Sequence, residues 1–178
     1  MQHFRVKVFA RPTPADFDLG AAIPVFHRWI QQNALPERLI DVADYQHVPA
    51  GPGILLVAHD AYYGLDRTKH RLGLLYTRRT AMEGSVADRI RSAVESSLRA
   101  CDLLEREPEF AGKLSFDRDK FELSVNDRML APNDEAAYTA LAAELRSVLD
   151  SAPGAGKYSL ASTGAVKELL TIAVSKSP

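Results

Sequence analysis

The chain has 178 residues, of which 46% are hydrophobic, as is typical of a folded globular protein and not of a disordered one. Lys and Arg total 22 against 23 for Asp and Glu, so the formal net charge is -1 at pH 7. This balance argues against general nucleic-acid binding, which depends on excess positive charge to attract phosphates. The length fits a single domain over residues 1–178.

The cysteine content excludes an internal disulfide, because Cys101 is the only cysteine. Its place in a helical pattern of apolar residues favours a small buried side chain over a nucleophile. Residues 1–12 lack the apolar core of a signal peptide, and no apolar run approaches the ~20 residues needed to cross a bilayer. We therefore expect a cytoplasmic protein that has no membrane partner.

The first half of the chain predicts the order strand, helix, then three strands. Alternating polarity predicts the strands, an apolar stripe at helical spacing predicts the helix, and Pro12 ends the first strand. The GPG segment at 51–53 has the composition of a type II turn. The predicted elements are a strand over 3–11, a helix over 23–32, strands over 39–48, 54–60 and 71–79, and a loop over 61–70.

The second half begins after the clearest helix of the chain, predicted over residues 85–107. Ser85 and Asp88 resemble a capping box at its start, and Pro108 ends it. The remaining predicted elements are a hairpin over 113–130 with its tip at 117–120, a helix that begins near 132 and includes 138–148, a linker over 151–157, and strands over 158–162 and 169–176.

These elements predict an α+β fold. We expect a mainly antiparallel sheet in two βαββ-like halves, residues 1–84 and 110–178, with three main helices packed on one face. The long helix over about 86–107 is expected to bridge the halves. Both halves then belong to one domain.

The glycine-rich and acidic segments do not match the phosphate-binding and calcium-binding motifs that they resemble. The GPG segment leads into a strand, whereas a phosphate-binding loop leads into a helix. The GAGK segment at 154–157 lacks the first glycine and the final Ser or Thr of a Walker A loop, and residues 117–122 lack the glycine of an EF-hand. Neither HExxH nor GxSxG occurs. We therefore predict no resident metal or cofactor and find no complete catalytic motif.

Residues 39–60 hold three aspartates and two histidines, and so form one candidate site. If the strands pair with Val48 opposite Ile54, Asp41 and His59 become diagonal neighbours, roughly 7–8 Å apart at the backbone. Two residues are fewer than the three protein ligands of a catalytic zinc site, so a structural or interface hairpin is favoured. The alternatives are a ligand pocket that uses His59, Asp60, Tyr62 and Tyr63, and a metal or catalytic centre.

Residues 59–71 form the best candidate for ligand recognition. Aromatic rings beside cations can bind a flat or anionic ligand through stacking and charge. The candidate binding residues are Tyr62, Tyr63, Arg67, Lys69, His70 and Arg71. The alternative is a solvated loop whose tyrosines fold onto the sheet.

Five segments resemble those of an uncharacterised bacterial protein family: VKVFARP, IPVFHRWIQ, LIDVADYxHVPxGPG, LGLLYTR and VNDRMLAPND. The resemblance spans nearly the whole chain and implies a bacterial cytosolic origin. It brings no activity, cofactor or catalytic residue.

The leading functional hypothesis is a non-enzymatic binding or protein-interaction module that forms a homodimer and has a protein or a small molecule as its partner. It depends on the lack of a complete catalytic motif. The second hypothesis is a small-molecule or metal-dependent enzyme that uses Asp41, His59 and Asp60. The third is RNA association through the loop 62–71, although the near-neutral charge disfavours a nucleic-acid partner.

Overall fold

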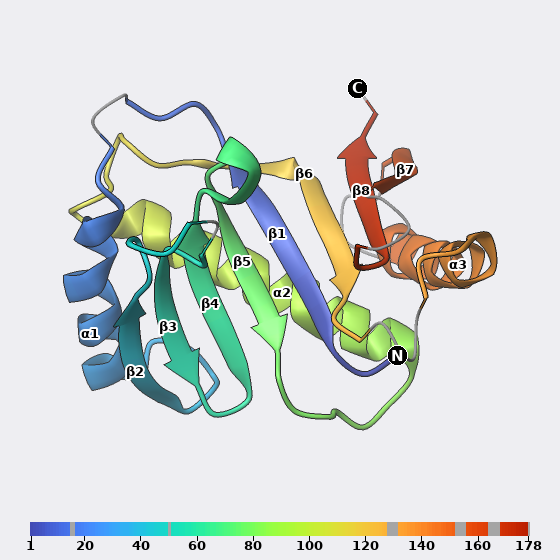
Figure 1. The fold of residues 1–178 in the computed structure, drawn as a ribbon, viewed down its shortest axis with the longest axis horizontal. Helices are drawn as coiled ribbons and strands as arrows, with labels where there is room; N and C mark the ends of the chain where they lie inside the picture. The colour runs from blue at the N-terminus through green and yellow to red at the C-terminus, as the bar shows by residue number, and fades with distance from the viewer. Residues whose placement is uncertain (15–16, 50, 128–131, 152–155, 164–167, 178) are drawn as a thin grey trace.

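The protein is an α+β fold in which eight antiparallel strands form one sheet, in the order β2-β3-β4-β5-β1-β6-β8-β7 (Figure 1). This computed structural model describes residues 1–14, 17–49, 51–127, 132–151, 156–163 and 168–177. The predicted fold class is confirmed, with three α-helices packed on the sheet. Among the described residues, no helix is long and apolar enough to cross a membrane.

The elements have the following bounds. The strands are β1 (Phe4–Ala10), β2 (Leu39–Asp44), β3 (Ile54–Ala58), β4 (Ala61–Asp66), β5 (Gly73–Arg78), β6 (Phe116–Val125), β7 (Tyr158–Thr163) and β8 (Thr171–Lys176). The helices are α1 (Ala22–Gln32), α2 (Val86–Arg106) and α3 (Glu135–Ser151), with 3-10 turns η1 (Leu19–Ala21) and η2 (Thr68–His70).

Strand β1 joins the two halves of the chain into one sheet. It pairs with β5 on one side and with β6 on the other, both antiparallel. Helix α2 lies behind the middle of the sheet and contacts β1, β5 and β6 as well as α3 (Figure 1). The long bridging helix predicted over about 86–107 is therefore confirmed, and the predicted two-part sheet is continuous.

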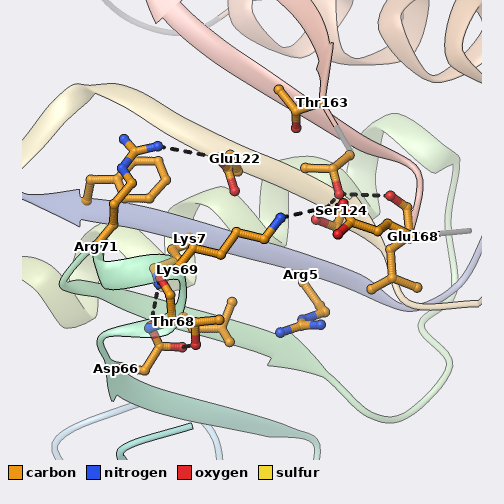
Figure 2. A pocket seen from close by; sticks show the side chains of 14 residues that line it. Arg5, Lys7, Asp66, Thr68, Lys69, Arg71, Glu122, Ser124, Thr163 and Glu168 are labelled. Atoms are coloured by element: carbon orange, nitrogen blue, oxygen red, sulfur yellow. Dashed lines mark hydrogen bonds and ion pairs between the residues drawn. The ribbon is translucent and has the colours of Figure 1, made fainter. Parts of the chain in front are cut away.

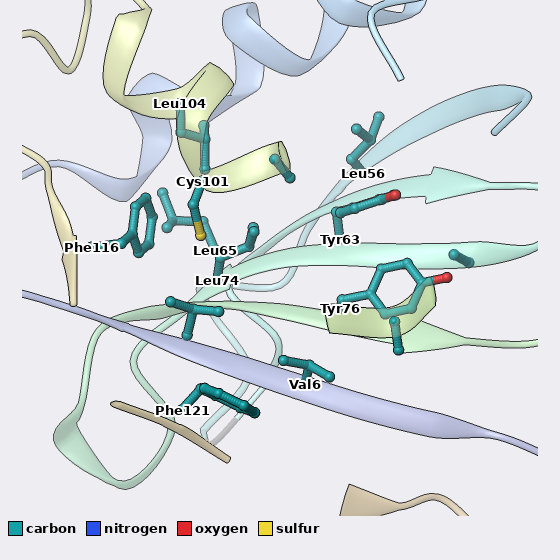
Figure 3. Close-up of a cluster of buried hydrophobic side chains, with 14 of the residues drawn as sticks. Val6, Leu56, Tyr63, Leu65, Leu74, Tyr76, Cys101, Leu104, Phe116 and Phe121 are labelled. Carbon is teal, nitrogen blue, oxygen red and sulfur yellow. The ribbon is translucent and has the colours of Figure 1, made fainter. Parts of the chain in front are cut away.

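The hydrophobic core lies between α2 and one face of the sheet. Side chains alternate along β1, so Val6 and Val8 are buried on this face while Arg5 and Lys7 point to the other. Figure 3 shows Cys101 of α2 close to the apolar residues of the sheet. Its predicted burial is confirmed, and burial raises the pKa of the Cys101 thiol, which disfavours the reactive thiolate.

A capping box begins α2, as the sequence predicts. The Ser85 hydroxyl accepts a hydrogen bond from the Asp88 amide at 3.1 Å, and the Asp88 carboxylate accepts one from the Ser85 amide at 3.0 Å. We expect Ser85→Ala to lower the free energy of unfolding by about 1 kcal/mol in urea titrations, because the Asp88 amide loses its acceptor. The exposed Ser147→Ala in α3 is the control and should cost nothing. An equal loss in both variants would contradict the capping role.

The segment predicted as a loop over 61–70 contains a strand instead. Residues 61–66 form β4, which pairs with both β3 and β5, and only residues 67–72 connect it to β5. His59 and Asp60 make the tight turn of the β3–β4 hairpin. The register of β2 also differs from the prediction, because Asp44, not Val48, lies opposite Ile54. Residues 45–48 turn back, with the Tyr45 amide donating to the Gly53 carbonyl at 2.8 Å.

The hairpin predicted around 117–120 is wrong, because residues 116–125 form the single strand β6. Arg118 forms ion pairs with Asp102 at 2.5 Å and with Glu105 at 2.7 Å, both on α2. Arg118, one of the charged residues that resemble a turn, therefore anchors the strand to the helix. Part of the predicted hairpin (128–130) and part of the predicted linker (152–155) lie outside the described residues.

Candidate functional site

A cavity of about 280 Å³ lies on the face of the sheet opposite to the core, over β1, β5 and β6 (Figure 2). The segment after β4, with Thr68, Lys69 and Arg71, forms one rim, and Glu168 and Leu169 before β8 belong to the other. We call this cavity the open-face pocket. Its charged lining residues are Arg5, Lys7, Asp66, Lys69, Arg71, Glu122 and Glu168.

The floor of the open-face pocket contains a buried ion pair between Lys7 of β1 and Asp66 of β4. Asp66 also accepts hydrogen bonds from the Thr68 amide at 3.2 Å and the Thr68 hydroxyl at 2.9 Å. In the described part of the chain, Lys7 and Asp66 are the two charged residues that are buried, with 8% and 1% of their surface exposed. The ion pair thus links β1 to the end of β4 and holds the η2 turn in place.

Two exposed ion pairs connect the rims to the rest of the pocket. Arg71 lies 3.6 Å from Glu122 of β6, and its guanidinium stacks on the Phe9 ring at 3.3 Å from the centroid. Lys69 reaches from η2 to Glu168 at 3.5 Å (Figure 2). Exposed pairs of this kind contribute little to stability. They do fix where the rim cations lie.

Arg5 differs from the other cations of the pocket. Within the described residues its guanidinium forms neither a hydrogen bond nor a salt bridge, and no interaction line reaches it in Figure 2. Burial lowers the pKa of Arg5, and the negative charge of Asp66 opposes that effect. A guanidinium carries five N–H donors, so desolvating it without acceptors costs free energy. The open-face pocket therefore has donors available for a bound molecule.

The rim also contains strained backbone. Lys69 and His70 have φ of 58° and 57°, the left-handed region that non-glycine residues rarely adopt. Such strain concentrates at functional sites, where the surrounding structure maintains it. Here the neighbouring Lys7–Asp66–Thr68 contacts stabilise the turn.

We expect His70→Gly to raise the free energy of unfolding by up to about 1 kcal/mol, because glycine adopts positive φ without steric cost. Thermal and urea unfolding measure the change. The control is Glu83→Gly, an exposed loop residue outside the positive-φ set, which should lower stability slightly. A loss in both variants would show that the turn stores no strain.

The predicted Asp41–His59 pair does not form part of this pocket. His59 Nδ1 lies 3.1 Å from the Asp60 carboxylate, while Asp41 is exposed and accepts a hydrogen bond from the Val42 amide. The Thr80 hydroxyl also donates to Asp60, and these hydrogen bonds lower the pKa of Asp60. The arrangement stabilises the tip of the β3–β4 hairpin. Among the described residues no group of three His, Cys, Asp or Glu side chains could hold a metal ion.

The predicted recognition residues over 62–71 separate into two groups, because β4 places them at opposite ends. Tyr63 is fully buried, with its ring 5.1 Å from that of Tyr76, and Tyr62 lies under the Arg79 guanidinium at 4.6 Å. Arg67 donates to the Phe17 carbonyl at 2.6 Å. Of the six predicted binding residues, Lys69 and Arg71 line the open-face pocket, and His70 is an exposed residue of its rim.

Sequence reasoning missed the residues of the pocket floor, Arg5, Lys7, Asp66, Glu122 and Ser124. Arg5 and Lys7 alternate with apolar residues, a pattern that also fits an ordinary solvent-facing strand. The sequence alone carried no signal for them, because the central position of β1 depends on its pairing with β5 and β6.

Protein-family models, curated proteins and solved structures were compared with the chain, and none matches it. The resemblance to a bacterial family therefore stays an expectation.

Proposed function

We propose that the protein binds a small polar molecule in the open-face pocket and that this molecule supplies hydrogen-bond acceptors to Arg5. The observation that carries the proposal is the Arg5 guanidinium, which lines the cavity without a hydrogen bond or salt bridge from the described residues. Cavities with a few converging polar groups are typical small-molecule sites.

Other arginines of the chain differ from Arg5, because they have partners within the protein. Arg28 binds Glu107 and Glu109 at 2.5 and 2.8 Å, and Arg89 donates to three backbone carbonyls. These arginines have structural partners that account for their positions. Arg5 lies on the central strand of the sheet but has no such partner among the described residues, which favours a ligand.

Ligand retention tests this proposal. Native mass spectrometry of gently purified wild type, together with a thermal-shift screen of small polar molecules, should find a ligand that Arg5→Gln loses. The control Arg146→Gln removes an exposed arginine of α3 and should keep the ligand. The proposal is wrong if no molecule distinguishes wild type from Arg5→Gln.

Self-association is a second candidate function, and it agrees with the expected homodimer. The exposed large hydrophobic residues among the described ones are Ile40, Tyr45 and Val48, all on the edge strand β2 or the turn after it. An edge strand also presents unpaired backbone groups to a second chain. Sedimentation equilibrium should show a dimer that Ile40→Lys dissociates. A monomeric wild type would contradict this candidate.

The enzyme and RNA hypotheses receive less support. Among the described residues Asp41 forms no hydrogen bond or ion pair with His59 or Asp60, and the tyrosines lie at the other end of β4 from Lys69 and Arg71.

A further inference from the structure

Arg5 and Ser124 lie opposite each other across the β1–β6 pair, on the floor of the open-face pocket. Directly opposite side chains on one face have Cβ atoms about 4.5–5.5 Å apart. Ser124 in turn lies opposite Thr171 of β8, which also lines the pocket. A guanidinium and a row of hydroxyl groups are therefore presented to the same small volume.

The hydrogen bonds of this row give it a direction. The Thr171 hydroxyl donates to the Leu169 carbonyl at 3.1 Å, so its single proton is used. The 2.8 Å contact between the two hydroxyls then has Ser124 as the donor. The lone pairs of the Ser124 oxygen stay available as acceptors. The pocket floor thus offers donors at Arg5 and an acceptor at Ser124.

The described lining of the pocket has one more cationic side chain than anionic side chains. Four cations, Arg5, Lys7, Lys69 and Arg71, line it against the three carboxylates Asp66, Glu122 and Glu168. Each carboxylate is ion-paired with one cation, so Arg5 has no carboxylate partner among the residues that the structure describes. A guanidinium presents a planar fork of donors that matches the oxygens of a carboxylate or a phosphate.

We propose, on the basis of the function above, that the ligand is a small hydroxylated oxyanion. Its carboxylate or phosphate group binds Arg5, and a hydroxyl on a nearby carbon donates to Ser124. The volume of about 280 Å³ lies at the lower end of the range for ligand pockets, so the ligand is no larger than a monosaccharide derivative. Phe9 and Leu75 supply apolar surface for the carbon atoms of the ligand.

Four probes separate the parts of this proposal: gluconate carries a carboxylate and hydroxyls, glucose 6-phosphate a phosphate and hydroxyls, hexanoate a carboxylate alone, and glucose hydroxyls alone. We expect gluconate or glucose 6-phosphate to bind wild type by calorimetry, and their preference order separates a carboxylate from a phosphate ligand. Hexanoate and glucose should each bind at least about tenfold more weakly, the loss of one good hydrogen-bonding group.

Matched variants test the two residues. Arg5→Gln should weaken both hydroxylated anions at least about tenfold, and Arg5→Lys should retain part of the affinity, since it keeps the charge but loses the fork. Ser124→Ala should weaken gluconate but leave hexanoate unchanged. Arg146→Gln should bind all four probes as wild type does, and circular dichroism verifies that each variant is folded.

The outcomes distinguish this inference from the proposed function. If glucose binds as well as gluconate and Arg5→Gln abolishes both, the small-molecule site stands and the oxyanion assignment is overturned. The hydroxyl assignment is overturned if hexanoate equals gluconate in wild type. If no probe binds at millimolar concentration, the oxyanion inference is overturned, and the broader retention experiment decides the proposed function separately.

Discussion

Replacing Asp66 by alanine should lower the free energy of unfolding by about 3–5 kcal/mol, because it leaves the Lys7 ammonium buried without its counter-charge. Asp66 is 1% exposed, and its carboxylate also accepts two hydrogen bonds from Thr68. The variant therefore loses an ion pair and two hydrogen bonds together. Denaturation in guanidinium chloride, followed by circular dichroism, measures the change.

A double-mutant cycle separates the pair from its surroundings. Lys7→Met alone should also destabilise, since it leaves the carboxylate of Asp66 buried, whereas Lys7→Met with Asp66→Leu should recover much of the loss. The control is Arg91→Met, which breaks an exposed ion pair with Asp88 and should cost less than about 0.5 kcal/mol. Additive single-mutant losses would contradict the coupling between Lys7 and Asp66.

The double variant also bears on the role of the ion pair. A buried pair is often no more stabilising than well-packed apolar residues of similar size. If the double variant folds well but no longer binds the ligand of wild type, the pair is present to shape the open-face pocket. Its links to Thr68 agree with this, because they hold the η2 turn from which Lys69 reaches Glu168.

Features that depend on local sequence were predicted correctly. The strand at Phe4–Ala10 and the helix at Val86–Arg106 follow from periodicity, and the capping box follows from the spacing of Ser85 and Asp88. The secondary structure of these elements is determined by residues close to one another in the sequence. The fold class follows from them because alternating and helical patterns determine which faces need burial.

Features that depend on tertiary pairing were not predicted. Residues 61–66 contain Gly64 and two tyrosines and resemble a loop, but they are a strand because β3 and β5 pair with them on both sides. The charges over 117–120 resemble a hairpin tip, but they lie within β6, and Arg118 contacts α2. The site was missed for the same reason, since strand order brings Arg5 next to Ser124 across more than a hundred residues.

Replacing Trp29 by alanine should lower the free energy of unfolding by about 3–5 kcal/mol, the usual cost of deleting a buried aromatic side chain. Trp29 is 1% exposed on α1 and packs against Phe26 at 5.4 Å between ring centroids. Its indole N–H donates to the carboxylate of Glu107, the residue that ends α2, at 2.5 Å. The side chain thus joins α1 to the C-terminal end of α2.

Trp29→Phe separates packing from the hydrogen bond. It keeps an aromatic ring in the core and leaves Glu107 paired with Arg28, so the loss should be smaller, about 1–3 kcal/mol. Circular dichroism must follow the unfolding, because the chain has one tryptophan. Arg146→Ala, at an exposed residue of α3, should change stability by less than about 0.5 kcal/mol. Equal losses in Trp29→Phe and Trp29→Ala would mean that the hydrogen bond to Glu107, and not the packing of the indole, joins the two helices.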